Sequence, residues 1–178
     1  MFRPVNQKVP MLIGIALINI VLFYLVSGSR VPHYTKGYEK KLEAAKLMNE
    51  SLDLIKNYQG NRVDFKIDLE DDPYGSGIIG PATTLITTSL AILRSKQTSV
   101  NANIAAMITD LFLDANLQKG DTIAVGLTGS LPAVNLAVLV VCEIMDIHPV
   151  IISSVGSSRW GATDPGFTWL DMESLLIK

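Results

Sequence analysis

Small polar residues gather in two turns, each of which follows a short apolar run, and they are the residues best suited to binding or chemistry. The first turn is Thr128-Gly129-Ser130 and the second is Gly156-Ser157-Ser158-Arg159-Trp160-Gly161. Glycines let a backbone approach a ligand closely, hydroxyls donate and accept hydrogen bonds, and a helix N-terminus presents free N–H groups. We predict an anion-binding site lined by Thr128, Gly129, Ser130, Ser157, Ser158, Arg159 and Trp160. In the alternative, Ser130 caps the next helix and the glycines only make turns.

Ser130 is the candidate nucleophile if this site is catalytic, with nearby N–H groups as an oxyanion hole. Its Gly-Leu-Thr-Gly-Ser context is not the Gly-x-Ser-x-Gly elbow of the hydrolases. Neither histidine is assigned as a base, because His33 lies near the membrane segment and His148 precedes the second strand, opposite the pocket. Asp164 and Asp171 suit an acid, a base or a helix cap equally. The catalytic residues therefore stay unknown at this level.

A predicted strand–helix–strand unit places the two turns. Residues 122–127 and 150–154 are short apolar runs typical of strands buried on both faces. Residues 131–145 are too long a run for one strand, and Pro132 suits the first turn of a helix. Such a crossover makes the strands parallel and brings both turns to one rim of the sheet. The predicted fold class is α/β, with an N-terminal transmembrane helix and a small, mostly parallel, Rossmann-like sheet with flanking helices.

The other segments are predicted to flank this unit. Apolar periodicity predicts an amphipathic juxtamembrane helix over residues 38–58, and alternation over 63–69 predicts a half-exposed strand at the sheet edge. The Thr-rich residues 82–93 predict a packed helix, followed by a polar connection over 95–100. Two further helices are predicted over 101–117 and from Thr168 to the end.

No cofactor or metal is predicted. The run Gly75-Ser76-Gly77-Ile78-Ile79-Gly80 satisfies the dinucleotide fingerprint formally, but it does not lie directly between a strand and a helix. We expect it to be a loop bordering the site. The acidic residues at 68 and 70–72 match no calcium-loop spacing and are expected to be a solvated strand end. Cys142 is the one cysteine and is expected to fill the core.

An uncharged apolar run near the N-terminus predicts a membrane anchor. Of the 178 residues, 1–8 form a tail, 9–26 the span, 27–60 a juxtamembrane segment and 61–178 the α/β domain. About 18 helical residues cover about 27 Å, close to the hydrocarbon thickness of a bilayer. An uncleaved signal-anchor is favoured over a cleaved signal peptide, and the domain is expected outside the cytoplasm. The net charge of −2 argues against a nucleic-acid partner.

The helix predicted over 131–145 has almost no polar face, since only Asn135 and Glu143 interrupt it. Such a helix must be covered on both sides. Neighbouring helices, a second subunit or protein beyond this chain could cover it. We therefore expect either a homo-oligomer or a truncated form of a longer architecture.

Several stretches carry a family resemblance: residues 119–121, 124–138, 150–162, 164–165 and 167–173, together with Asp72-Pro73, Gly77, Gly80-Pro81 and Thr98-Ser99. They resemble the poly-γ-glutamate system proteins, which are encoded beside the synthase of that capsular polymer in various bacteria. The resemblance implies a membrane setting and a pathway rather than a reaction. Members of that family are longer, so the resemblance leaves open whether this chain contains the whole active unit.

Two functions are therefore expected. The first is a membrane-anchored accessory protein of poly-γ-glutamate synthesis, export or processing, in which Arg159 pairs with an anionic group and Trp160 forms an apolar wall. Its partners would be the membrane, the synthase components and an anionic ligand or polymer. The alternative is a non-catalytic scaffold of the synthase complex. A third class, a nucleotide-dependent oxidoreductase, would require dinucleotide binding.

Overall fold

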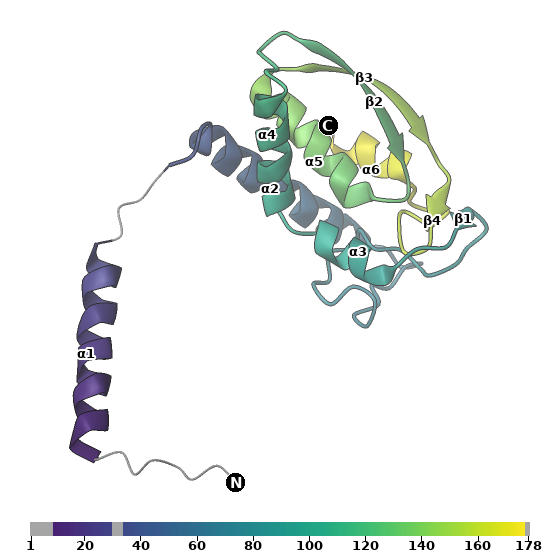
Figure 1. Ribbon diagram of the computed structural model, residues 1–178. Coiled ribbons are helices and arrows are strands. Elements are labelled where there is room, and N and C mark those ends of the chain that lie inside the picture. Colours follow the sequence, from purple (N-terminus) through teal and green to yellow (C-terminus); the bar gives the residue numbers. More distant parts are fainter. Residues whose placement is uncertain (1–8, 30–33, 177–178) are drawn as a thin grey trace. The chain divides into compact units, whose positions relative to one another are not determined.

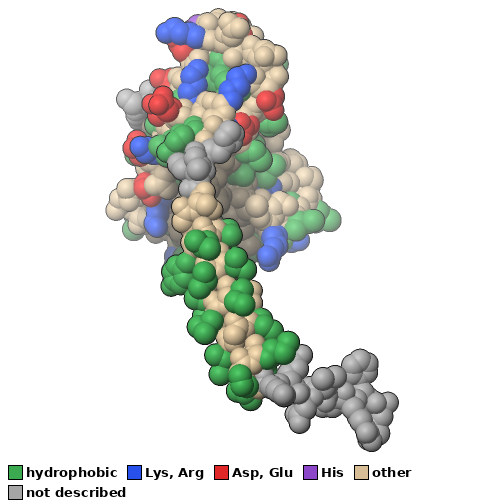
Figure 2. Space-filling model, turned by 60° about the vertical axis from the view of Figure 1, so that its left-hand side comes forward, with side chains coloured by type: hydrophobic (Ala, Val, Ile, Leu, Met, Phe, Trp, Pro, Cys, Tyr) green, Lys and Arg blue, Asp and Glu red, His purple; other side chains and the backbone are tan. Residues whose placement is uncertain are grey.

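The computed structural model describes residues 9–29 and 34–176, and it divides into two compact units, Met1–Lys36 and Gly37–Lys178. The described part of the first unit contains the helix α1 (Val9–Gly28). It is the one helix, among the described residues, long and apolar enough to cross a membrane. Its apolar side chains point outward around the helix (Figure 2), and its 20 residues match the roughly 30 Å of a bilayer core. The predicted tail and His33 lie outside the described residues.

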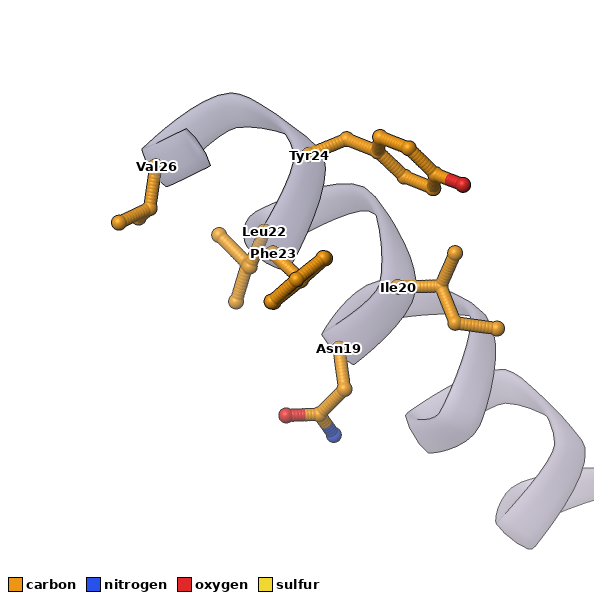
Figure 3. A pocket seen from close by; sticks show the side chains of 6 residues that line it. All are labelled: Asn19, Ile20, Leu22, Phe23, Tyr24 and Val26. Atoms are coloured by element: carbon orange, nitrogen blue, oxygen red, sulfur yellow. The ribbon is translucent and has the colours of Figure 1, made fainter. Parts of the chain in front are cut away.

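Asn19 is the only strongly polar side chain in α1, and the helix satisfies it internally. Its Nδ2 donates to the carbonyl oxygen of Ile15, 2.8 Å away. Figure 3 shows Asn19 among Leu22, Phe23 and Val26, with Ile20 and Tyr24 nearby. Because all of these side chains come from a single helix, the hollow between them is a helix surface and supplies no binding site.

The second unit is a mixed α/β domain (Figure 1). Its described residues form five helices, α2 (Tyr38–Gly60), α3 (Leu93–Ser99), α4 (Asn103–Asp114), α5 (Pro132–Met145) and α6 (Trp169–Leu176). They also form two parallel two-stranded sheets. One pairs β2 (Thr122–Thr128) with β3 (His148–Ser154), and the other pairs β1 (Thr87–Ser89) with β4 (Ser157–Ser158).

The β2–α5–β3 unit confirms the predicted parallel crossover. The register pairs Thr122 with His148 at one end and Thr128 with Ser154 at the other, so both strands end at the same rim. Pro132 occupies the first turn of α5, as predicted, and Asp146 ends the helix in the left-handed conformation with φ 55°. Both turns that follow the strands therefore start from one edge of the sheet.

Helix α5 is the centre of the domain, and its apolar surface is covered within the chain. Helices α2 and α4 pack on it, and β2 and β3 lie against it (Figure 1). The largest fully buried side chains of the domain come from α2, α5, α6 and the segments before β1 and α6: Trp169, Phe167, Met48, Ile55, Ile78, Leu136 and Met172. Of the three covers expected for this helix, neighbouring helices and strands are the one observed.

The strands are buried on one face only, so the prediction of burial on both faces was wrong. Ile123, Val125 and Leu127 of β2 face the helices, whereas the alternate residues of both strands are exposed. Val150 and Ile152 keep 61% and 80% of their surface exposed. Successive residues of a strand point to opposite faces, so every second residue faces α5. The sequence does not show whether an apolar residue on the opposite face is covered by a second layer or exposed. The described chain provides no second layer for that face.

Residues 63–69 form no strand, contrary to prediction. They run as a loop, with Val63 fully exposed and with a turn in which Asp68 accepts from the backbone N–H groups of Glu70 and Asp72. Arg62 binds Asp64 at the start of the loop. Alternation alone does not make a strand, because a strand needs a partner for its backbone groups. The half-buried Phe65 and Ile67 instead lie along the surface.

The helix predicted over residues 82–93 is also absent. This segment is extended and contains β1, while the predicted polar connection over 95–100 is mostly the helix α3. Threonine is β-branched and its hydroxyl competes for backbone groups. Thr84 and Thr88 do this by donating to the carbonyls of Thr163 and Ser157. The predicted helices over 38–58, 101–117 and from Thr168 are confirmed as α2, α4 and α6.

Candidate functional site

The two polar turns lie side by side, as predicted, and are joined by direct hydrogen bonds. The Gly129 N–H donates to the carbonyl of Gly156 at 3.2 Å, and the Ala162 N–H donates to the carbonyl of Gly129 at 2.7 Å. The Ser157 hydroxyl also donates to Gly129 O at 2.8 Å. We call the group Gly129, Ser130, Ser157, Ser158 and Gly161 the serine junction.

Ser130 does not cap α5, so the alternative reading of this residue was wrong. The N-cap position is Leu131, which has no side-chain cap. The Ser130 hydroxyl instead accepts the backbone N–H of Ser158 at 3.0 Å. This bond ties the first turn to β4 and commits one lone pair of the Ser130 oxygen.

On its other side, the serine junction is held by β1. The Ser157 N–H donates to the carbonyl of Ile86 at 3.2 Å, and the Arg159 N–H donates to that of Ser89 at 3.0 Å. Ser157 is fully buried and Ser158 retains 7% of its surface exposed. The backbone of β4 is thus fixed between two segments that lie about 30 and 70 residues away in the sequence, which restricts the positions that its side chains can take.

Lys96 of α3 reaches into the serine junction, and sequence reasoning missed it. Its Nζ lies 2.8 Å from the Ser158 Oγ and also donates to the Ser130 carbonyl oxygen. The side chain is buried, with 4% exposed. A lysine in a polar stretch gives no signal of burial, because lysines are almost always exposed. The helix that carries Lys96 was missed as well, because residues 95–100 were predicted to be a polar connection.

Lys96 is buried without a counter-charge. It forms no ion pair with any carboxylate in the described residues, whereas Lys119 is paired with Asp146 at 2.7 Å and Lys41 is paired with Asp110. Burial lowers the pKa of Lys96 below the ordinary lysine value, because it disfavours the charged amine. The amine that contacts the serine junction is therefore displaced towards its neutral form.

This burial predicts a pH dependence of stability. Between the lowered pKa of folded Lys96 and the unfolded value of about 10.4, the unfolded chain binds more protons, so the free energy of unfolding should rise with pH. The slope is at most about 1.4 kcal/mol per pH unit. Chemical denaturation of the wild type and Lys96→Met across this window should show the difference between them rising with pH. A difference that is flat with pH would contradict an unpaired, buried amine.

The wild type must be compared with Lys96→Met, because Cys142 also makes the stability of the wild type depend on pH. Burial raises the pKa of the Cys142 thiol, so its contribution to stability is present below the unfolded thiol value of about 8.5 and is lost as pH rises from there through the raised folded value. That contribution has the opposite sign. It is common to both proteins and cancels in the difference.

Arg159 and Trp160 directly follow β4 and so lie next to the junction. The Arg159 Nε donates to the Thr83 hydroxyl at 3.1 Å, and its guanidinium carbon lies 5.2 Å from the centre of the Trp160 ring. Arg159 forms no ion pair within the described part of the chain. The Trp160 Nε1 donates to Asp71 at 2.9 Å, so the indole is fixed in orientation. Other N–H groups of the guanidinium remain available to donate hydrogen bonds to a bound carboxylate.

Trp160 adopts φ 57°, a conformation that L-residues with large side chains rarely take. Such strain persists where the surroundings hold it in place, and it is often found at functional sites. Here Asp71 holds the ring and Gly161 packs against Gly129 and Ser157. The junction is therefore closely packed as well as polar.

The glycine-rich loop lies next to the junction and has no strand–turn–helix form. Gly80 N–H donates to the carbonyl of Gly161 at 3.0 Å, as expected for a bordering loop. Asp72 orders this loop by accepting from the Ser76 hydroxyl and the Gly77 N–H. Asp72 is 1% exposed, so the expectation that the whole acidic run is solvated was wrong for this residue. No cluster of metal-ligating side chains is present in the described residues.

None of the other candidate acids and bases bonds to the serine junction, and both aspartates have structural partners of their own. Asp164 pairs with Arg62 at 2.6 Å, and Asp171 accepts from the N–H and hydroxyl of Thr168 as a helix cap. His148 lies at the amino end of β3, opposite the junction, as predicted. None of the three reaches the serine junction, which leaves Lys96 as the base candidate that the structure adds.

Searches against protein-family models, curated proteins and solved structures find no match to this chain. The fold and the junction define a mixed α/β domain in a chain that also has an apolar N-terminal helix.

Proposed function

We propose that this chain is a membrane-anchored accessory protein of poly-γ-glutamate synthesis, export or processing, and that it binds a carboxylate of the polymer beside the serine junction. Helix α1 would be a single-pass anchor, with the α/β domain outside the cytoplasm. The β2–α5–β3 unit would belong to a Rossmann-like sheet, with the site beyond the carboxyl ends of its strands. Poly-γ-glutamate is proposed as the ligand because the sequence resembles the poly-γ-glutamate system proteins.

One observation carries the binding proposal: Arg159 has donors available at the edge of a preorganised polar junction. Its guanidinium lies beside Thr83 and Trp160 and forms no ion pair among the described residues. A carboxylate binds a guanidinium through two parallel hydrogen bonds, and such charge-assisted bonds contribute about 1.5–3 kcal/mol. Poly-γ-glutamate presents one carboxylate per residue, so one such contact could be repeated along its length.

The test is binding of poly-γ-glutamate to the full-length protein in detergent. Arg159→Gln should weaken binding at least about tenfold, because the lost contact exceeds about 1.4 kcal/mol. Lys119→Gln is the matched control, since Lys119 is already paired with Asp146 and lies before β2, at the other end of the sheet. Equal weakening by both variants would mean only general attraction between a cation and a polyanion, and it would contradict a site at Arg159.

A second function, a non-catalytic scaffold, is supported by the open face of the β2–β3 sheet. Parallel sheets are normally covered on both faces, and Val150 and Ile152 are largely exposed here. We propose that a second copy of this chain covers that face, as in a homo-oligomer. The synthase components would then be held by the assembled protein.

Ile152→Lys tests this scaffold. The variant chain should still fold, because the side chain is 80% exposed within a single chain. Sedimentation analysis in detergent should show the wild type as an oligomer and Ile152→Lys as a monomer. Leu85→Lys, at a residue 99% exposed on another segment, should leave the oligomer intact. A monomeric wild type would contradict the proposal.

A further inference from the structure

We propose that Ser158 and Lys96 form a nucleophile–base pair for acyl transfer. Their Oγ and Nζ atoms are 2.8 Å apart, which is within reach for direct proton transfer. A serine hydroxyl is a weak nucleophile until a neighbouring base takes its proton. No base could be assigned to a catalytic serine from the sequence alone. In the structure, Lys96 of α3 is such a base.

Lys96 has the surroundings that a lysine base requires. A lysine accepts a proton only in its neutral form, so it must be kept away from water and from carboxylates that would hold it charged. Lys96 is 4% exposed and has no ion-pair partner in the described residues. As a neutral amine it can donate to the Ser130 carbonyl, which directs its lone pair towards Ser158.

Ser158 is better placed than Ser130 to be the nucleophile. The Ser130 hydroxyl accepts the Ser158 N–H at 3.0 Å, and its oxygen lies in the bond that joins the turns. The Ser158 hydroxyl instead contacts the Lys96 amine. The Ser158 backbone is held by β1 and by Ser130, so the distance between Oγ and Nζ is set by fixed elements.

The reaction balances with water as the only co-reactant. Lys96 takes the Ser158 proton while Oγ attacks the acyl carbon of an amide, and the resulting ammonium returns the proton to the departing amine. An acyl-serine ester remains. Lys96 then takes a proton from water, hydroxide adds to the ester, and Ser158 leaves and regains its proton from Lys96. The C–N bond is replaced by C–OH and N–H, and both side chains are restored.

The substrate class follows from Arg159 and rests on the proposed function. Arg159 is the next residue after Ser158, and its donors are available to an anion. An amide or ester whose acyl part carries a carboxylate would place the anion at Arg159 and the acyl carbon at Ser158. A glutamyl amide has this arrangement.

In the competing explanation, Lys96 is structural and only joins the turns through Ser130 and Ser158. The two roles predict different reactivities. A structural lysine stabilises the fold but leaves Ser158 as unreactive as any serine, whereas a base activates it. Lys96→Arg keeps a long cationic donor but cannot act as a base at neutral or mildly alkaline pH, so it separates bonding from proton transfer.

The experiment treats full-length protein in detergent with an alkyl fluorophosphonate and maps the modified peptide by mass spectrometry. We expect a phosphonyl group on Ser158, with fluoride released, and none in Ser158→Ala. Lys96→Met and Lys96→Arg should label at least about a hundredfold more slowly, the usual loss when a general base is removed. Ser95→Ala, which changes an exposed serine beside Lys96, should label as the wild type does. Thermal unfolding identifies any variant that has lost its fold.

Label on Ser130, no label on Ser158, or wild-type rates in a folded Lys96→Arg would each overturn the pair. If both lysine variants fail to fold, the wild-type labelling rate decides the question: it must rise with pH as Lys96 loses its proton, and a rate that does not rise overturns the proposal. Labelling needs no polymer, so failure of the pair and failure of polymer binding are read separately.

Discussion

Gly161→Ala is expected to cost about 3 kcal/mol of unfolding free energy and to separate the two turns of the serine junction. A Cβ at this position would overlap the Gly129 carbonyl oxygen and the Ser157 Oγ, and it would lie 2.9 Å from the Ser130 carbonyl oxygen. Two of these three atoms belong to the backbone and cannot rotate away. Inserting one carbon into a packed site usually costs 1–3 kcal/mol, and the upper end applies where the backbone must move.

Chemical denaturation measures this cost, and fluorophosphonate labelling reports the separation of the turns. Gly60→Ala is the control, because a Cβ there would have no neighbour within 4 Å and alanine favours the helix end. It should change stability by less than about 1 kcal/mol. A Gly161→Ala protein as stable as the wild type would show that the turns are not packed together as described.

Trp169→Ala should destabilise the domain by about 3–5 kcal/mol, the usual cost of removing a large core aromatic. Trp169 is fully buried at the start of α6, next to the buried Phe167. Because domains are commonly stable by only 5–15 kcal/mol, the variant should be close to unfolding at physiological temperature. Thermal and denaturant unfolding measure the effect.

Comparing Trp169→Ala with Trp169→Phe separates the contribution of the ring's volume from that of its N–H group. The Trp169 Nε1 is buried and has no hydrogen-bond partner among the described residues. Trp169→Phe removes that donor and keeps most of the ring, so it should cost much less than the alanine variant. Leu170→Ala, at the adjacent exposed residue, should cost less than about 1 kcal/mol. Equal losses in Trp169→Ala and Leu170→Ala would contradict the described core.

The helices and the parallel crossover could be predicted because their signals are local. Pro132 at a helix start, an apolar run of helical length and two short apolar strands define β2, α5 and β3 without knowledge of their neighbours. The same signals place the turns at one rim, and the hydrogen bond between Gly129 and Gly156 confirms it.

The errors occurred where neighbours decide the structure. Residues 63–69 alternate like a strand but have no partner to pair with, and the threonine-rich 82–93 segment is extended because its hydroxyls bond to distant carbonyls. Whether Val150 and Ile152 face a core or solvent depends on a second layer that a strand pattern does not reveal.

The candidate site was predicted in part for the same reason. Ser130 and Ser158 could be predicted as site residues, because they are hydroxyl side chains in turns that follow predicted strands. Lys96 gives no such signal, because its burial depends on α3 packing against the junction from more than 30 residues away. A contact that joins three separate segments is visible only once they are folded together.

The most direct measurement of the binding proposal is an NMR titration of isotope-labelled, full-length protein in detergent with poly-γ-glutamate. The amide signals of the serine junction, Arg159 and Trp160 should shift with added polymer, and these shifts should be lost in Arg159→Gln. Shifts confined to other basic segments, such as the exposed lysines of α2, or an unchanged spectrum at the junction would contradict a carboxylate site there.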